Sequence, residues 1–555
     1  MLLFLLIITL AGLYLNRSIS YEKYERIRFE SSGAFLYANL YFPSKSIEFQ
    51  SKRPLIIYCH GIGSQRDFDL RLPIELTKRG FYVAALDYQG HGESQGEITR
   101  INNENNIPAL ALDCSNLLDK LEGKAFFSDV NKSQIGLIGH SLGGMVVLMN
   151  QALDDRFQVT VTWAPLVQDV IGIAQSETFL NYMPNNLLNK NNTKNLLVIM
   201  HVDDPSLNYS QHALKAQELT NCSVIPIREP VIDGGHQLMC NKAVIESIKW
   251  FEINFFGSET KNGRIKITFF INYALIFLNL GVLFAFIIIL ISYASDFFAT
   301  KENKDKEIEF NENKLTNTKI PNINRNRQIA VIILFIVLFI INWDIFSSLF
   351  GILGIFIASI NVAVIFLIVK VYKSYRNKEK RIEISLKKVK NYFKIHFISK
   401  NLLFTMLCNY YFLGIYFLFS FFYPFGFMLP KSILDLFIAQ IFFPVFLSME
   451  ILYRKIIYPN LNFIESEKKK SSIIILIAIY IQVNLIAATL DWSFFPSVIF
   501  LYGILLFVVI QNTLIFEDTK SFSAVLFSFD TIQIYFAAAF SNALGIGTVI
   551  FYFIN

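Results

Sequence analysis

Hydrophobic and polar positions are distributed differently in the two halves of this 555-residue chain. In the first half, apolar runs of four or five residues alternate with polar stretches. This pattern is typical of buried strands separated by loops and helices. It predicts an α/β fold, a mostly parallel sheet flanked by helices. The strand-like runs are residues 55–58, 82–86, 135–138, 159–163, 196–200 and 224–227.

The second half consists of long apolar runs broken by basic loops. A helix that crosses the hydrocarbon core of a bilayer needs about 20 apolar residues. Residues 267–555 are therefore expected to form an all-α membrane domain of about eight transmembrane helices. Residues 522–554 are compatible with one span or two, and Asp530 favours one. The expected spans are Ile267–Tyr293, Ile329–Trp343, Leu349–Val369, Leu402–Tyr423, Ser432–Leu452, Ile473–Leu490, Pro496–Ile515 and Ile532–Phe553.

A further apolar run, Leu2–Leu15, precedes the first domain. It is short for a membrane span and lacks a basic residue before it. Residues 1–16 are interpreted as a signal anchor or a cleaved signal peptide, and the sequence leaves both open. Either would export the domain that follows.

The charge of the loops predicts the orientation of the spans. Lys and Arg number seven in residues 294–328, eleven in 370–400 and five in 453–471, whereas 344–348 and 491–495 have none. Cytoplasmic loops carry the excess of Lys and Arg in membrane proteins. The protein is therefore expected to be a multi-pass protein of the cell membrane, with its first domain outside the cytoplasm.

Composition agrees with a membrane protein and excludes a nucleic-acid binder. The chain is 53% hydrophobic and contains 55 Phe, with a mean hydropathy of +0.43. Its net charge of +6 arises in the basic loops, so it is not the footprint of a nucleic-acid site. Membrane lipids are the expected partners, and the sequence does not indicate an oligomeric state.

The candidate chemistry centres on the stretch Gly139-His140-Ser141-Leu142-Gly143-Gly144, between two apolar runs. This is the G-x-S-x-G pattern of a serine exposed at a tight turn between a strand and a helix. His60-Gly61-Ile62-Gly63 ends an earlier strand-like run. Asp87-Tyr88-Gln89-Gly90-His91-Gly92-Glu93-Ser94 ends the next, and Asp87 is expected to order that turn.

With these motifs, residues 24–257 resemble the α/β-hydrolase superfamily. The likeness is nearest to the branch of monoglyceride-lipase-like esterases and serine aminopeptidases. The resemblance implies a triad in the chain order Ser, Asp, His. It makes Ser141 the nucleophile, His236 the base and Asp204 the acid, with Asp203 as the rival acid. It also implies an oxyanion hole made by the backbone N–H groups of Ile62 and Leu142.

The segment at about 164–195 is long enough for a small lid and is rather apolar. An apolar lid is compatible with acyl chains, although the same side chains are equally compatible with packing on the domain. The sequence contains no metal-site or nucleotide-binding motif, so no cofactor and no metal are expected.

These features predict a membrane-bound serine hydrolase that cleaves a carboxylic ester, with lipid-derived esters among the candidates. A peptidase or amidase of the same fold is the alternative within the enzyme class. A non-catalytic binding module attached to a transporter-like membrane domain is the alternative outside it.

Overall fold

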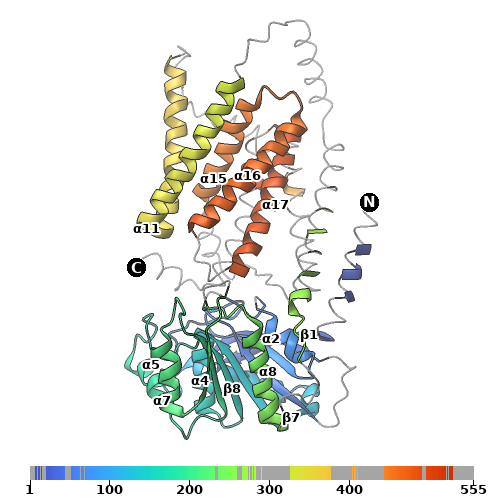
Figure 1. Cartoon of the computed structure of the whole chain (residues 1–555), viewed down its shortest axis with the longest axis vertical. Coiled ribbons are helices and arrows are strands. Elements are labelled where there is room, and N and C mark those ends of the chain that lie inside the picture. Colours follow the sequence, from blue (N-terminus) through green and yellow to red (C-terminus); the bar gives the residue numbers. More distant parts are fainter. Residues whose placement is uncertain are drawn as a thin grey trace.

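The computed structural model describes residues 21–43, 52–62, 64–67, 69–231, 235–258, 265–272, 325–376, 443–489 and 495–520, and scattered positions within 7–15, 274–289, 403–409 and 522–528. Figure 1 shows a sheet domain at one end of the molecule and a group of helices at the other. Several expected features lie wholly or mostly outside the described residues: the amino-terminal run, the basic loops at 294–324 and 377–400, and the spans at 402–423 and 532–553.

An eight-stranded sheet forms the centre of the first domain, in the order β1-β2-β4-β3-β7-β8-β9-β10. The strands from β4 to β10 in that order run parallel, whereas β1 and β2 form an antiparallel hairpin and β2 pairs antiparallel with β4. The mostly parallel sheet is thus confirmed, and each of the six expected runs lies within one of its strands. The strands are β1 Lys23–Ser31, β2 Ala34–Phe42, β3 Arg53–Cys59, β4 Tyr82–Asp87, β7 Val130–His140, β8 Val159–Trp163, β9 Leu196–His201 and β10 Ser223–Ile227.

Apolar side chains cover the sheet on both faces. Along β3, Leu55 and Ile57 belong to one core cluster, whereas Ile56 and Tyr58 belong to a second. Successive side chains of a strand point to opposite faces, so a strand sealed on both sides reads as a continuous apolar run. The first cluster packs beneath α3 (Asp113–Glu122) and α4 (Leu142–Leu153), and the second beneath α2 (Arg71–Thr77) and α8 (Asn241–Phe256).

The hairpin β1–β2 was not expected from the sequence. Every second residue near the end of β1 is exposed, and its apolar positions are interrupted by charged ones. An antiparallel strand with one face in solvent lacks the continuous apolar run of a strand that is covered on both faces. Shorter elements complete the domain: β5 Ile101–Asn102, β6 Ile107–Pro108, η1 Ala109–Ala111, η2 Ala125–Asp129, α5 Glu177–Tyr182, α6 Pro184–Leu187, the π-helical turn η3 Ser210–Leu214 and α7 Lys215–Thr220.

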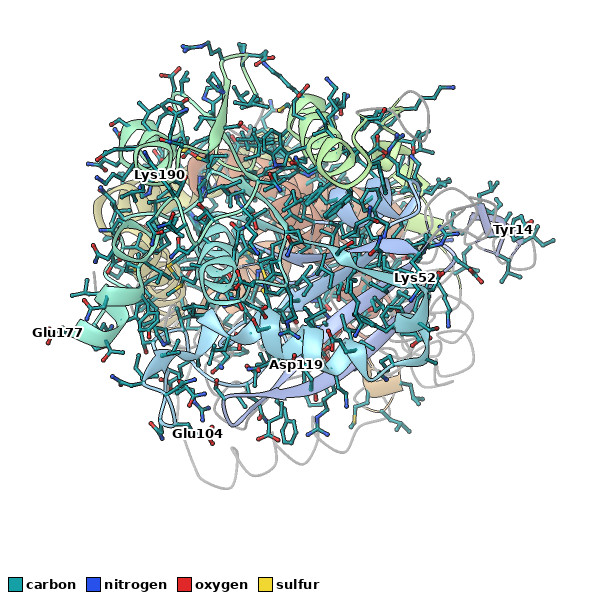
Figure 2. All side chains as sticks on the ribbon, turned by 90° about the horizontal axis from the view of Figure 1, so that it is seen from below. Tyr14, Lys52, Glu104, Asp119, Glu177 and Lys190 are labelled. Atoms are coloured by element: carbon teal, nitrogen blue, oxygen red, sulfur yellow. The ribbon has the colours of Figure 1, made fainter. Side chains whose placement is uncertain are left out.

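Figure 2 shows the sheet domain from the side opposite the helices. Charged side chains such as Glu104, Glu177 and Lys190 lie on this side and are exposed. This end of the molecule therefore has the polar surface of a domain in water.

Helix α11 covers two of the expected spans, Ile329–Trp343 and Leu349–Val369, but without the expected loop between them. It is continuous from Arg325 to Arg376, across the residues 344–348 that were expected to form a loop. However, Asn342 Nδ2 donates a hydrogen bond to Ala358 O over 2.9 Å. In a straight helix these residues would lie about 24 Å apart along the axis. The helix therefore folds sharply back, and Figure 1 shows its two limbs meeting on the side of the sheet domain.

The first limb of α11 has one packed face and one exposed apolar face. Phe339 and Trp343 are buried against other helices, whereas Leu334, Leu338 and Ile341 are about half exposed. Among the described residues, one stretch, Arg325–Phe346, is long and apolar enough to cross a membrane, and an 18-residue window within it has a mean hydropathy of 2.8. The structure therefore supports one candidate span directly.

The remaining described helices are α15 Phe443–Glu450, the π-helical turn η4 Ile451–Ile457, the turn η5 Tyr458–Leu461, α16 Glu467–Thr489 and α17 Phe495–Thr519. The helical path continues past Leu452, where the expected basic loop 453–471 was placed. Arg454 lies within it and is buried, and its Nε donates to Glu450 Oε2 over 3.1 Å. The prediction of a solvated loop at this residue was wrong, because the ion pair lets the helix bury an arginine.

The ion pair between Arg79 and Glu252 predicts a measurable stability loss. Arg79 makes two hydrogen bonds to the fully buried carboxylate of Glu252 in α8, at 2.6 and 2.9 Å. Arg79→Met leaves that carboxylate buried without a counterion, which costs about 3–5 kcal/mol. We expect the temperature of half-inactivation to fall by roughly 10 °C.

The measurement is fluorophosphonate labelling of the heated full-length protein. The control is Lys215→Met, which breaks the exposed pair with Glu218 and should change the midpoint by about 2 °C or less. Equal shifts for the two variants would show that the buried pair adds nothing.

Candidate active site

Ser141 lies at the turn between β7 and α4, where the chain approaches its neighbours closely. Its backbone is in a rarely populated region, with φ 52° and ψ −117°. A Cβ atom on Gly139 would lie 2.2 Å from Gly143 O, and one on Gly143 would lie 2.2 Å from His60 O. Both positions therefore require glycine, as the G-x-S-x-G pattern predicts for a nucleophile at a strained turn.

The structure brings Ser141, His236 and Asp204 together. His236 Nε2 is 3.1 Å from Ser141 Oγ, and His236 Nδ1 is 2.9 Å from Asp204 Oδ2. Because a carboxylate only accepts hydrogen bonds, Nδ1 carries the proton. Nε2 is then left to accept the hydrogen bond from the Ser141 hydroxyl.

Asp204 and Asp203 have different surroundings. The side chain of Asp204 is fully buried, and its Oδ1 also accepts the N–H groups of Ser206 and Leu207 at 2.8 and 3.0 Å. Burial alone would raise the pKa of Asp204, but its hydrogen bonds and the nearby His236 bring that pKa below the usual value. Asp203 is exposed, and its N–H donates to His201 Nδ1. Of the two candidates for the acid, only Asp204 contacts His236.

The loop after β3 lies against the serine. A Cβ atom on Gly61 would lie 3.4 Å from Ser141 Cβ and 2.7 Å from His140 Nδ1, so glycine is required there too. Ile62 follows Gly61, and Leu142 is the first residue of α4, where backbone N–H groups have no partner within the helix. The two expected oxyanion-hole residues thus flank the serine from two segments.

Asp87 holds this loop in place. Its Oδ1 accepts the N–H of Arg66 at 2.6 Å, and its carboxylate also pairs with the Arg66 guanidinium. Its Oδ2 accepts the N–H of Glu93 at 3.0 Å, which orders the following turn as expected. Burial alone would raise the pKa of Asp87, but Arg66 and His60 lower it overall. The tie to the oxyanion loop was not foreseen, because Arg66 belongs to no recognisable motif.

Two further histidines support the site. His140 Nε2 donates to the backbone oxygen of His236 at 2.9 Å. Burial and the neighbouring His236 lower the pKa of His140 to about 3, so it is neutral near pH 7. His60 Nδ1 donates to Gly61 O at 2.8 Å and so supports the loop that carries Ile62.

His212 was missed in the sequence, where nothing marks it. It is fully buried in η3, and its Nδ1 accepts the N–H groups of Val167 and Gln168 at 3.0 and 3.4 Å. Burial is the main cause that lowers its pKa to about 4. Neutral His212 therefore fixes the start of the segment after β8.

The segment at 164–195 is largely packed on the domain. It contains α5 and α6, and of its large apolar side chains only Val170 and Leu180 stand among the strongly exposed ones. Most of its apolar residues thus serve the core, which was the alternative to an acyl-chain lid. The buried ones are Leu166, Val167, Ile173, Phe179, Met183 and Leu188. In the part of the chain that the structure describes, no three His, Cys, Asp or Glu side chains gather as a metal site would need.

The low pKa of His212 predicts a loss of stability in mild acid. Its pKa is about 4 in the folded state and about 6.5 in the unfolded chain. Below pH 6.5 the unfolded state therefore binds more protons, and stability falls as the pH drops towards 4. At pH 5 this single group contributes about 2 kcal/mol to the loss.

The replacement His212→Gln keeps an acceptor for the two N–H groups but does not titrate. We expect the midpoint of urea denaturation to fall less steeply between pH 7 and pH 5 in this variant than in the wild type. Parallel curves would show that His212 is protonated equally in both states. His201→Gln is the control, because His201 also accepts a backbone N–H, from Asp203.

Comparisons with known proteins agree with this geometry. Residues 50–223 match the family model described as serine aminopeptidase, S33. An uncharacterized 31.7 kDa protein of the traX-finO intergenic region of Escherichia coli is 33% identical over 114 residues, which cover 20% of this chain and 37% of that protein. The putative hydrolase YtaP of Bacillus subtilis is 30% identical over 128 residues, covering 20% of this chain and 42% of that one. The chain thus spans less than half the length of these curated relatives.

Solved structures overlap the same domain. Est1E of Butyrivibrio proteoclasticus with bound ferulic acid covers 36% of this chain and 88% of its own, at 19% identity and a TM-score of 0.30. An acylaminoacyl peptidase of Pyrococcus horikoshii covers 46% and 44%, at 14% identity and a TM-score of 0.34. These scores are too low to add to the assignment. Its mostly parallel sheet, its strained serine turn and the family match over residues 50–223 show that the first domain has the α/β-hydrolase fold.

Proposed function

We propose that this protein is a membrane-bound serine hydrolase that cleaves a carboxylic ester through an acyl-enzyme on Ser141. The observation that carries the proposal is the hydrogen-bonded series from Asp204 through His236 to Ser141. A serine hydroxyl is a weak nucleophile until a base removes its proton. His236 is held in the tautomer that does so, since Nδ1 donates to Asp204 and Nε2 faces the hydroxyl.

The proposed reaction has two steps. In the first, Ser141 Oγ attacks the carbonyl carbon while its proton passes to His236 Nε2, and the N–H groups of Ile62 and Leu142 stabilise the oxyanion. The intermediate collapses to the acyl-enzyme, and His236 gives the proton to the departing alcohol. In the second, His236 deprotonates a water that attacks the acyl carbonyl. The acid is released, and the proton returns to Ser141.

An ester with an acyl chain is favoured over a peptide by the two exposed apolar side chains of residues 164–195, Val170 and Leu180. The names of relatives point both ways. The family model is described as a serine aminopeptidase, whereas a guinea-pig (Cavia porcellus) relative, 24% identical over 172 residues, is named platelet-activating factor acetylhydrolase. A peptidase is therefore the second candidate. A kcat/KM higher for alanine p-nitroanilide than for p-nitrophenyl butyrate would favour it.

We further propose that the helical half spans the membrane several times. The support is an apolar surface on its helices. The second limb of α11, like the first, has exposed apolar side chains, Ile365 and Ile368. Leu476 and Val483 of α16 are exposed as well, and about half or more of the surface of each of these four residues is accessible. Exposed apolar surface on this scale is rare in contact with water. Lipid is the environment that such a surface fits.

The orientation follows from the two ends of the helical half. At one end, Arg325 lies over the Phe463 ring, and Lys470 and Lys520 pair with Glu467. The opposite end holds the bend of α11, which in Figure 1 faces the hydrolase domain. Because basic groups gather on the cytoplasmic side, this arrangement favours a hydrolase domain outside the cytoplasm.

The choice of acid in the triad is tested by two neighbouring substitutions. Asp204→Asn removes the carboxylate that orients His236, and we expect kcat for p-nitrophenyl butyrate to fall about 10⁴-fold. Asp203→Asn changes an exposed residue one position away, and kcat should stay within about twofold. A large loss of kcat in Asp203→Asn and a small one in Asp204→Asn would make Asp203 the acid.

The site and its location are tested together by labelling cells with a membrane-impermeant fluorophosphonate. We expect the wild-type protein to be labelled in intact cells and Ser141→Ala to be unlabelled in both intact and broken cells. Labelling only after breakage would keep the nucleophile and overturn the orientation. Absence of labelling of the folded wild type in both preparations would favour the non-catalytic binding module.

A further inference from the structure

Helix α2 lies between the loop that carries His236 and the first residues of the apolar run at 267–293. Arg71, at its start, contacts the loop, and Glu75, one turn later, contacts residues 268 and 269. Residues four apart lie on the same side of a helix, with their Cβ atoms about 6 Å apart. One short helix thus joins the active site to the segment that leads towards the membrane.

Arg71 holds the backbone just after the catalytic histidine. Its Nη1 donates to Leu238 O at 2.7 Å, and its Nη2 donates to Gln237 O at 2.9 Å. The preceding carbonyl, that of His236, accepts from His140. Three consecutive carbonyl groups are therefore held by side chains from β7 and α2, the elements on either side of the loop.

This loop needs such support. Leu238 has a positive φ of 47°, which a side chain with a Cβ rarely adopts and which persists only where the surroundings enforce it. Arg71 is itself fixed: it pairs with Asp69 at 2.6 Å and stacks over the Trp163 ring at 4.8 Å. A guanidinium held on both sides is a rigid donor of two hydrogen bonds.

The other contact of α2 is with residues 265–269. The buried Glu75 accepts the N–H groups of Thr268 and Phe269 with one oxygen, Oε1, at 2.7 and 2.6 Å. Lys78 pairs with Glu75 at 2.9 Å and donates to the Thr268 hydroxyl. A carboxylate that accepts the first N–H groups of a helix fixes where that helix begins.

Apolar packing reinforces this contact. The side chains of Ile265, Ile267 and Phe269 are packed against the core cluster that also contains Leu72, Ile74 and Leu238. The start of the apolar run and the histidine loop therefore share one packed cluster as well as one helix.

We propose that α2 links the membrane-proximal segment to catalysis: Arg71 is a positioning residue for His236, and Glu75 holds α2 in the place where Arg71 can act. The proposal rests on the proposed hydrolase function. Its physical basis is that a displacement of about 1 Å of a catalytic group can cost about 10²-fold in rate. A change in how residues 265–269 are held would thus alter the rate of acyl transfer without any contact to the substrate.

The first test replaces Arg71 in the full-length protein, kept in detergent micelles. Arg71→Met removes both donors, and we expect kcat for p-nitrophenyl butyrate to fall about 100-fold with KM within about threefold. Arg71→Lys keeps the charge and one donor, and it should recover about tenfold of that loss. A purely structural role would lower the thermal midpoint and leave kcat of the folded fraction unchanged.

The second test addresses the link itself. Glu75→Leu removes the acceptor for the two N–H groups and should lower kcat about tenfold, whereas Glu75→Gln keeps an acceptor oxygen and should lose at most about threefold. The matched control is Glu246→Leu, which breaks a Lys–Glu pair of the same spacing on α8 and should change kcat by less than about twofold.

The double variant Arg71→Met/Glu75→Leu decides whether the two residues act through one path. If they do, the kcat of the double variant equals that of Arg71→Met alone. Without the Arg71 side chain, a shift of α2 has no further effect on the loop that carries His236. A kcat lowered by the product of the two single-variant losses would overturn the link. Wild-type kcat in Arg71→Met would overturn the positioning role while the hydrolase function stands. A wild type without fluorophosphonate labelling would instead defeat the function on which the link rests.

Discussion

The strained backbone at Ser141 is the constraint on which the rest of the hydrolase domain depends. A residue with a side chain holds φ at 52° only where strand β7, helix α4 and the loop after β3 meet at backbone contact. The glycines at 139 and 143 make that contact possible, since a Cβ atom on either would overlap a backbone carbonyl oxygen. The turn places the serine hydroxyl next to His236, and it allows Gly61 to lie against Ser141.

The groups around the serine are kept rigid by buried polar contacts instead of by apolar packing alone. Asp87 and Arg66 hold the oxyanion loop, and His140 and Arg71 hold the carbonyls of the histidine loop. His212 holds the backbone at Val167. Each of these side chains is buried and hydrogen-bonded, all but that of Arg66 to the main chain, so each is costly to displace. Catalysis by a serine requires this rigidity, because the nucleophile, base and oxyanion donors belong to three separate segments.

The helical half follows a different physical rule. Its helices pack through apolar side chains but also bury a group of polar side chains. Glu450 pairs with Arg454, Asn512 Nδ2 donates to Glu450 Oε1 at 3.0 Å, and Arg454 Nη2 donates to Thr513 Oγ1 at 2.7 Å. In an apolar medium a buried charge persists only with a partner. This group therefore fixes which faces of α17 and of the helical segment 443–461 meet.

The order of the triad residues came from the resemblance to a known superfamily. The sequence by itself determined the strands of the parallel sheet and the serine turn. These features are local: a strand buried on both faces reads as an apolar run, and a tight turn demands glycine at fixed positions. It did not determine whether Asp203 or Asp204 is paired with His236, since one residue of register turns a side chain from solvent to the site. Nor did it indicate Arg66, Arg71, His212 or the Glu450–Arg454 pair. Their partners lie far away in the chain or one helical turn along a face, and only packing decides which residues meet. A reversal of the chain was expected between the spans Ile329–Trp343 and Leu349–Val369. Its form was not: residues 344–348 are helical instead of a loop, and the contact of Asn342 with Ala358 exists only once the two limbs are packed.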